Sequence, residues 1–400
     1  MKKPDQRRRF LQASAALFGA AALGSRSARA EAAAGAAGGA ATPVTAGPPA
    51  AVRPGPPDPH PASSHTLTRI AFGSCAKEDK DQPIWDAVLD ARPDLFVFLG
   101  DNVYGDTTDM AVLRAKYAQL AAKPGFRRLR EATPIVATWD DHDYGANDAG
   151  AEYPQKEASR RVFLEFWGEP AGTPRWGRDG VYAGYVFGPE GRRVQILLPD
   201  LRYNRAPILK LDLGSRSYED WAKQLADAGR FVPGPYVRNP ARDATMLGEP
   251  QWAWLEAELA RPAEVRILAS SLQVLADLPG WEAWINYARD HQRLVETIRR
   301  HRANGLVCIS GDTHYGELSK LDVNVPYPLW DLTSSGLTEV WPVVPPNANR
   351  VGEVLREANF GLIEIDWTRP RPGLSLQVRD VNGEVRLERR VRTEDLVVPA

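Results

Sequence analysis

The sequence predicts an α/β fold in which helices cover the faces of a mainly parallel or mixed sheet. Short apolar runs, typical of strands buried on both faces, alternate along the chain with segments of helical periodicity. The chain has 400 residues, of which 43% are hydrophobic and 25% charged. It is therefore long enough for one large α/β domain or two small ones.

The expected elements begin near residue 67 and continue towards the C-terminus. Apolar runs of strand length are found at residues 68–73, 94–99, 134–139, 193–198, 264–269 and 305–310. Apolar residues recur at helical spacing in residues 83–91, 110–122, 251–260 and 291–302. Beyond these, residues 361–366 and 374–379 are strand-like. Asn382-Gly383 follows them and is the dipeptide typical of a tight hairpin turn.

The first 30 residues have the parts of an export signal. Arg7-Arg8-Arg9-Phe10-Leu11 fits the twin-arginine pattern, and an apolar, alanine-rich stretch follows at residues 13–23. Ala28-Arg29-Ala30 has the small-x-small form of a cleavage site. The apolar stretch is too short for a transmembrane anchor. We therefore expect a signal peptide at 1–30, read by the twin-arginine export machinery, and a periplasmic or secreted protein.

A spacer and one folded body are expected after the signal. Residues 31–65 are rich in Ala, Gly and Pro and lack hydrophobic periodicity, which predicts a disordered linker. The folded domain is then expected at residues 66–400. The net charge of the whole chain gives no sign of a nucleic-acid or acidic-membrane partner, because its 50 basic and 51 acidic residues nearly cancel and no basic run interleaves with aromatics. The two cysteines, Cys75 and Cys308, do not form a disulfide framework.

Several predicted strands end in short loops that carry metal-competent side chains. The loops are Gly73–Cys75, Gly100–Tyr104, Asp140–Asp143 and Gly311–His314. In open α/β sheets, ligands bind outside the carboxyl ends of the strands. Carboxylate, thiolate, phenolate and imidazole groups all bind hard or borderline cations. Each residue alone is more often a cap, a turn or a packing residue. Four such loops from one sheet can converge, however, and together they predict a metal site.

These motifs resemble the PhoD-like alkaline phosphatase and phosphodiesterase branch of the metallophosphoesterases. The matching motifs are Phe72-Gly-Ser-Cys75, Leu99-Gly-Asp-Asn-Val-Tyr104, Thr138-Trp-Asp-Asp-His-Asp143 and Ser310-Gly-Asp-Thr-His314. The resemblance implies a four-layer α/β/β/α sandwich of two mixed sheets flanked by helices. It also implies that the domain at 66–400 is an exported, metal-dependent hydrolase of phosphate esters.

The resemblance assigns roles to individual residues. Asp101 is expected to bridge two metals, and His142 to lie near the leaving group. The implied metal ligands are Cys75, Asp101, Tyr104, Asp141, Asp312 and His314. Asn102 and Asn147 lie close enough in sequence to contribute to substrate binding. The strand end Ala269–Gln273 matches a further family motif, so we expect Ser270, Ser271 or Gln273 to line the site.

The sequence departs from the wider superfamily in ways that bear on the metals. Gly73-Ser74-Cys75 replaces the usual Asp-x-His motif, and of six histidines only His142 and His314 fall in motif positions. A site with few imidazoles disfavours two zinc ions. It favours Fe³⁺ held by Tyr104 and Cys75, with Ca²⁺ or another divalent cation beside it.

The expected reaction is attack of a metal-bound hydroxide on phosphorus, with protonated His142 as general acid. A phosphodiesterase or phospholipase D-like activity remains an alternative to a phosphomonoesterase. An exported, metal-stabilised binding protein without turnover is a second alternative, and His142 argues against it because a structural site needs no acid. A serine hydrolase is disfavoured, since the sequence has no Gly-x-Ser-x-Gly motif.

Overall fold

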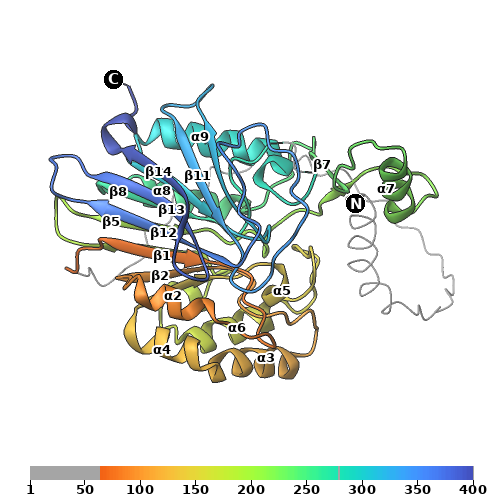
Figure 1. The fold of residues 1–400 in the computed structure, drawn as a ribbon, viewed down its shortest axis with the longest axis horizontal. Helices are drawn as coiled ribbons and strands as arrows, with labels where there is room; N and C mark the ends of the chain where they lie inside the picture. The colour runs from red at the N-terminus through yellow and green to blue at the C-terminus, as the bar shows by residue number, and fades with distance from the viewer. Residues whose placement is uncertain (1–63, 278–279, 400) are drawn as a thin grey trace, which may run out of the picture. The chain divides into compact units, whose positions relative to one another are not determined.

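The computed structural model describes residues 64–277 and 280–399 (Figure 1). The predicted signal peptide, and the predicted linker up to residue 63, lie outside the described residues. Within the described part of the chain, no helix is both long and apolar enough to cross a membrane.

Two six-stranded mixed sheets form the centre of the fold. The first sheet has the order β14-β13-β12-β1-β2-β3, and β1, β2 and β3 run parallel to one another. Its strands are β1 (Arg69–Gly73), β2 (Leu95–Leu99), β3 (Ile135–Thr138), β12 (Asn359–Asp366), β13 (Gly373–Asp380) and β14 (Val385–Arg392). The second sheet has the order β10-β11-β9-β8-β5-β4, with parallel β5, β8, β9 and β11. Its strands are β4 (Ala183–Phe187), β5 (Val194–Leu198), β8 (Val265–Ala269), β9 (Leu306–Ser310), β10 (Gly316–Leu321) and β11 (Leu329–Ser334).

Helices cover the outer faces of both sheets (Figure 1). Those beside the first sheet are α2 (Ile84–Asp90), α3 (Met110–Ala122), α4 (Pro124–Ala132) and α6 (Lys156–Trp167). Those beside the second sheet are α8 (Gly248–Leu259) and α9 (Ala288–Arg300). Shorter turns of helix are α5 (Asp141–Tyr144), η1 (Pro174–Trp176), η2 (Trp284–Tyr287) and η3 (Thr393–Asp395).

A separate unit comprises residues 211–235 and contains α7 (Tyr218–Asp227), which Ser217 caps by accepting a hydrogen bond from the Asp220 N–H. Two short strands adjoin this segment in sequence. They are β6 (Leu209–Lys210) and β7 (Tyr236–Val237), which pair antiparallel.

The alternation of side chains in β2 shows how the layers are held together. Leu95, Val97 and Leu99 lie in the core that contains the buried residues of the second sheet. Phe96 and Phe98 point the other way, into a core shared with the helices beside the first sheet. An uninterrupted apolar strand is therefore what this position requires, because both of its faces are covered. The predicted four-layer α/β/β/α class is confirmed.

The predicted elements agree closely with the structure. The six internal strands begin and end within one residue of the predicted bounds, and Asn382-Gly383 joins β13 to β14 as a hairpin. Cys75 and Cys308 are both free and buried. The sequence analysis did not find several elements in which charged or small residues interrupt the apolar ones, among them α4, α6, α7, β4, β10 and β11.

Candidate metal centre

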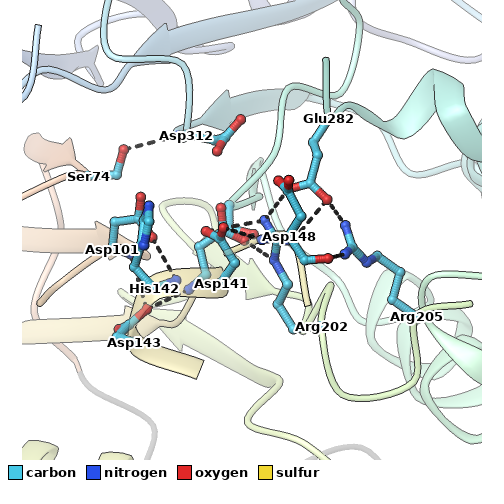
Figure 2. Close-up of polar contacts among 12 residues, drawn as sticks. Ser74, Asp101, Asp141, His142, Asp143, Asp148, Arg202, Arg205, Glu282 and Asp312 are labelled. Atoms are coloured by element: carbon cyan, nitrogen blue, oxygen red, sulfur yellow. Dashed lines mark hydrogen bonds and ion pairs between the residues drawn. The ribbon is translucent and has the colours of Figure 1, made fainter. Parts of the chain in front are cut away.

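The four predicted loops converge at the carboxyl ends of strands from both sheets. The loops of Cys75, Asp101 and Asp141 follow β1, β2 and β3 of the first sheet. The loop of Asp312 and His314 follows β9 of the second sheet. The expectation that one sheet supplies all four loops is therefore wrong. The loops still meet, because Asp141 from the first sheet and Asp312 from the second bring carboxylate oxygens within 4.8 Å of each other (Figure 2).

Four of the predicted ligands form one compact group. The Cys75 Sγ lies 3.4 Å from Asp101 Oδ2, and the Tyr104 hydroxyl lies 3.4 Å from the same oxygen. The Tyr104 hydroxyl is also 3.2 Å from His314 Nε2. Ligand atoms of Cys75, Asp101 and His314 all lie within 4.8 Å of one another. One carboxylate oxygen of Asp101 is thus shared by a thiol and a phenol.

A second group, made only of carboxylates, lies beside the first. Asp140, Asp141 and Asp312 each offer an oxygen within 4.8 Å of the others. Asp140 Oδ2 and Asp141 Oδ1 are buried and have no hydrogen-bond partner among the described residues. A buried carboxylate oxygen without a partner is costly, so a bound cation would stabilise this arrangement.

The backbone at the predicted ligands adopts an unusual conformation. Cys75, Asp101, Asp312 and His314 have φ angles of 63°, 50°, 70° and 60°. Left-handed backbone at a non-glycine residue costs roughly 1–3 kcal/mol and is concentrated at functional sites. The tight turns direct successive ligands into one small volume.

Gly100 shows why these loops carry glycine. Its φ angle is +95°, and a Cβ atom there would lie 2.5 Å from the Cβ of Asp140. The two ligand-bearing loops can approach each other only because residue 100 has no side chain.

Burial makes this centre unfavourable for negative charge. Burial raises the pKa of the Cys75 thiol, the Asp101 carboxyl and the Tyr104 phenol well above their ordinary values, and nearby carboxylates add to the effect. Burial also lowers the pKa of His314 to about 4, so its imidazole is neutral and able to bind a metal. A cation would offset the charge of the crowded acids, so this donor set fits a bound metal ion.

His142 lies at the edge of the centre and is paired with an acid. Its Nδ1 is 2.8 Å from both carboxylate oxygens of Asp106, and its ring packs on Tyr104 with centroids 4.3 Å apart. Burial alone would lower the pKa of His142. The charges of Asp141 and Asp101 and the hydrogen bond with Asp106 outweigh burial and raise it to about 11. The side chain is 18% exposed, so the protonated ring remains reachable from solvent.

Asp143 stabilises the loops of Asp101 and Asp140 by accepting hydrogen bonds from both. Its Oδ1 accepts hydrogen bonds from the backbone N–H groups of Asp101 (3.2 Å) and Asp140 (2.8 Å). Its Oδ2 accepts from Asn102 Nδ2 (2.5 Å) and the Tyr117 hydroxyl (3.0 Å). One buried carboxylate therefore satisfies four donors and fixes the turn in which Asp101 lies.

We expect Asp143→Ala to lower the free energy of unfolding by about 3 kcal/mol, because it leaves several buried donors without an acceptor. Urea unfolding of metal-free protein measures this. The control is Asp86→Ala, which removes an exposed ion pair with Arg128 and is expected to change stability by about 0.5 kcal/mol or less. Equal effects of the two substitutions on the free energy of unfolding would contradict this stabilising role of Asp143.

The predicted substrate-binding residues have different surroundings. Asn102 donates to Thr138 O and Asp143, while its buried Oδ1 lacks a partner within the described residues. Asn147 is exposed on the loop after α5. Gln273 is buried, and its amide donates to Glu317 and Thr333.

The two serines of the same strand-end motif also differ. Ser271 donates a hydrogen bond to Asp140 Oδ1 at 2.8 Å, next to the carboxylate group. Ser270 donates to Leu272 O and accepts from Trp284 Nε1, away from it. Of these two, Ser271 alone contacts a residue of the centre.

The sequence analysis missed several charged residues at the centre. They are Asp106, Asp148, Arg202, Arg205 and Glu282 (Figure 2 labels all but Asp106). Arg202 follows β5, so its place at a strand end was an available signal. Glu282 and Arg205 gave no such signal, because their partners are distant in the sequence.

Residues 70–343 match the model of a protein family described as "PhoD-like phosphatase". The chain belongs to this family. The match includes all four motif loops, so the predicted resemblance is confirmed. The description of the family as phosphatases agrees with the predicted class of phosphoric ester hydrolases.

Individual relatives agree with this family assignment. Alkaline phosphatase D of Bacillus subtilis (strain 168) is 24% identical over 303 residues, which are 66% of this chain and 49% of the relative. The chain thus spans about half the length of that relative. The "Structure of PhoD" aligns with a TM-score of 0.60 at 16% identity, covering 84% of this chain and 70% of the other. A dimetal phosphatase from Danio rerio aligns with a TM-score of 0.51 at 15% identity, covering 82% and 100%. Both solved structures share the fold.

Proposed function

We propose that this PhoD-like chain is a metal-dependent hydrolase of small phosphate esters. The observation that carries the proposal is the thiol–phenol–carboxylate–imidazole group of Cys75, Tyr104, Asp101 and His314. Beside it lies the carboxylate group of Asp140, Asp141 and Asp312, in which Asp140 Oδ2 and Asp141 Oδ1 accept no hydrogen bond from the described residues. Both groups lie at strand ends, where α/β folds bind ligands. Metal ions there would activate the attacking water and neutralise the phosphoryl oxygens.

We infer that Cys75 and Tyr104 would hold Fe³⁺, and that Asp101, which lies next to both, would be a ligand to it and to the neighbouring ion. The all-oxygen group of Asp140, Asp141 and Asp312 suits Ca²⁺ or another hard divalent cation. The Cys75 thiolate and the Tyr104 phenolate are strong electron donors. They favour a metal ion that accepts electron density, which supports iron at the first group.

Metal analysis together with a visible spectrum tests the iron proposal. Tyr104→Phe is expected to weaken or abolish a visible charge-transfer band. Tyr327→Phe is the control and should leave the band intact, because the buried Tyr327 hydroxyl donates a hydrogen bond to Ala303 O. Fully active protein that is colourless and free of iron would refute this assignment.

His142 is proposed as the general acid for the departing alkoxide. Asp106 holds Nδ1, which leaves Nε2 as the nitrogen free to face a substrate. Cations bound at Asp101 and Asp141 would compensate two of the charges that raise the pKa of His142. Asp106 would then be the main group that keeps the imidazole protonated.

Asp106→Asn is therefore expected to change the pH dependence of turnover. An acid is lost as the pH rises through its pKa, and removing the Asp106 charge lowers that pKa. The alkaline limb of kcat should move down by about 1 pH unit. Asn also tolerates the left-handed backbone of residue 106, which has a φ angle of 43°. A pH profile with an unchanged alkaline limb would contradict the pairing.

Paired assays separate the two ester classes. p-Nitrophenyl phosphate reports monoester hydrolysis, and bis-p-nitrophenyl phosphate reports diester hydrolysis of the phosphodiesterase or phospholipase D-like kind. We expect hydrolysis of at least one of them by metal-replete protein. Hydrolysis of neither would favour the non-catalytic, metal-stabilised binding protein.

We also propose export by the twin-arginine route, giving a periplasmic or secreted enzyme. The support is the sequence alone, in Arg7-Arg8 and the segments that follow. Replacing both arginines with lysine should retain the protein in the cytoplasm in cell fractionation. Unchanged export of that variant would exclude this route.

A further inference from the structure

A group of buried acids borders the proposed metal centre and is balanced by two buried arginines (Figure 2). Asp140, Glu282 and the Asp141 side chain face Arg202, whose side chain is 0% exposed. Arg205 pairs with Glu282 and donates to the backbone carbonyl of Asp148. Charges this deeply buried are stable only when they are paired with opposite charge.

Arg202 contacts its acids through all three guanidinium nitrogens. Nε donates to Asp140 Oδ1 at 2.5 Å, and Nη1 donates to Glu282 Oε1 at 3.0 Å. Nη2 lies 2.8 Å from Glu282 Oε2 and 3.6 Å from Asp141 Oδ1. The guanidinium thus lies between the metal-centre acids on one side and Glu282 on the other.

The same acids could hold a metal ion if the arginine were absent. Asp141, Asp148 and Glu282 each offer an oxygen within 4.8 Å of the others, and Asp140 adds a further buried carboxylate. A set of three or four carboxylates is the kind of oxygen-rich site that Ca²⁺ prefers. Arginine is always charged, as a metal ion is, but it is part of the chain and cannot dissociate.

Asp141 shows why the position of Arg202 matters for the metal centre. The backbone N–H of Asp148 donates to Asp141 Oδ2 at 2.7 Å, which fixes one oxygen. The other oxygen, Oδ1, has no hydrogen-bond partner in the described ranges and has Arg202 Nη2 at 3.6 Å. The Asp148 N–H therefore orients the Asp141 carboxylate, and Arg202 offsets its charge from one side. Oδ1 can still bind a cation of the metal centre.

We propose that Arg202 is a built-in cation that takes the place of an additional metal ion and positions Asp141 for the metal centre. Arg202 is thus a positioning residue, and this role rests on the proposed metal-dependent function. Removing it should uncover a cation site that the native chain fills with its own side chain.

Calcium binding to purified variants tests this proposal. Chelator-treated wild type, Arg202→Ala, Arg202→Lys and the control Arg175→Ala are equilibrated with Ca²⁺ alone, and bound calcium is counted. Arg175 is a matched control because it is buried and paired with the single acid Glu169. We expect one more Ca²⁺ per chain in Arg202→Ala than in wild type, and no gain in Arg202→Lys or Arg175→Ala. Adding Glu282→Gln to Arg202→Ala should remove the extra ion.

Each result decides the proposal. A folded Arg202→Ala that binds no more Ca²⁺ than wild type overturns it. If Arg202→Ala does not fold, Arg202→Lys decides instead. Lysine keeps the charge but not the fork of hydrogen bonds, so the affinity of the metal centre should fall about 10-fold or more. Unchanged affinity in that variant would overturn the positioning role. A wild type that binds no metal and hydrolyses no ester would refute the proposed function, while the Ca²⁺ count in Arg202→Ala still reports on the cation site.

Discussion

Asp101→Ala is expected to remove bound metal and phosphate ester hydrolysis together. Asp101 Oδ2 lies 3.4 Å from both Cys75 Sγ and the Tyr104 hydroxyl, so its loss takes away the carboxylate that the donors share. A bound metal supplies several kcal/mol of transition-state stabilisation, and about 1.4 kcal/mol is tenfold in rate. We therefore expect kcat/KM to fall by about 1,000-fold or more. Metal content by mass spectrometry and kcat/KM on the same preparation measure both losses.

Two further variants make the result specific to the carboxylate. Asp101→Asn retains a side chain that tolerates the left-handed backbone at φ 50°, so loss of metal in this variant cannot come from backbone strain. Asp109→Ala is the matched control, since Asp109 caps α3 by accepting from the Ala111 N–H. It should cost about 1 kcal/mol of stability and no metal. Full metal content in Asp101→Ala would show that the centre lies elsewhere.

The sequence was sufficient to predict the six internal strands that have unbroken apolar runs. In β2 the apolar run is unbroken because each face lies against a different core, so the buried strand is visible without any neighbour. The chemistry-bearing residues follow such strands directly, at Cys75, Asp101 and Asp312. A local pattern thus predicted both the strand and the position of the candidate ligand.

The order of strands could not be read in the same way. β9, which carries the Asp312 loop, belongs to the second sheet, although its apolar run resembles those of β1 and β2. Sheet membership depends on pairing between distant segments, such as β9 with β8 and β11. A single sequence contains no local signal for that pairing.

Polar contacts between residues far apart in the sequence decide which candidate side chains face the centre. Local sequence patterns do not predict such contacts. Arg202 and Glu282 are 80 positions apart, and His142 and Asp106 are 36 apart. Gln273 follows a strand as the candidate ligands do, yet its amide donates a hydrogen bond to Glu317, 44 positions away. Position at a strand end therefore predicts where a side chain lies but not what it contacts.

His142→Ala is expected to keep the metals and slow turnover by about 100-fold to 10,000-fold, the range of general acid catalysis. His142 could instead be a metal ligand, because it also offers a nitrogen within 4.8 Å of Asp101 and Asp141 oxygens. A ligand and an acid differ in what their removal does. Loss of a ligand empties the centre, whereas loss of the acid harms only substrates whose leaving group needs a proton.

The leaving group therefore separates the two roles of His142. A nitrophenolate departs readily without a proton, so His142→Ala should slow p-nitrophenyl phosphate much less than an alkyl phosphate. His301→Ala is the matched control, since His301 follows α9 with Glu256 3.9 Å away, and it should affect neither substrate. If His142→Ala loses metal and slows both substrates equally, His142 is a ligand and the acid must be sought in another group. If metal is retained and only the alkyl substrate suffers strongly, the Asp106–His142 pair is the proton donor.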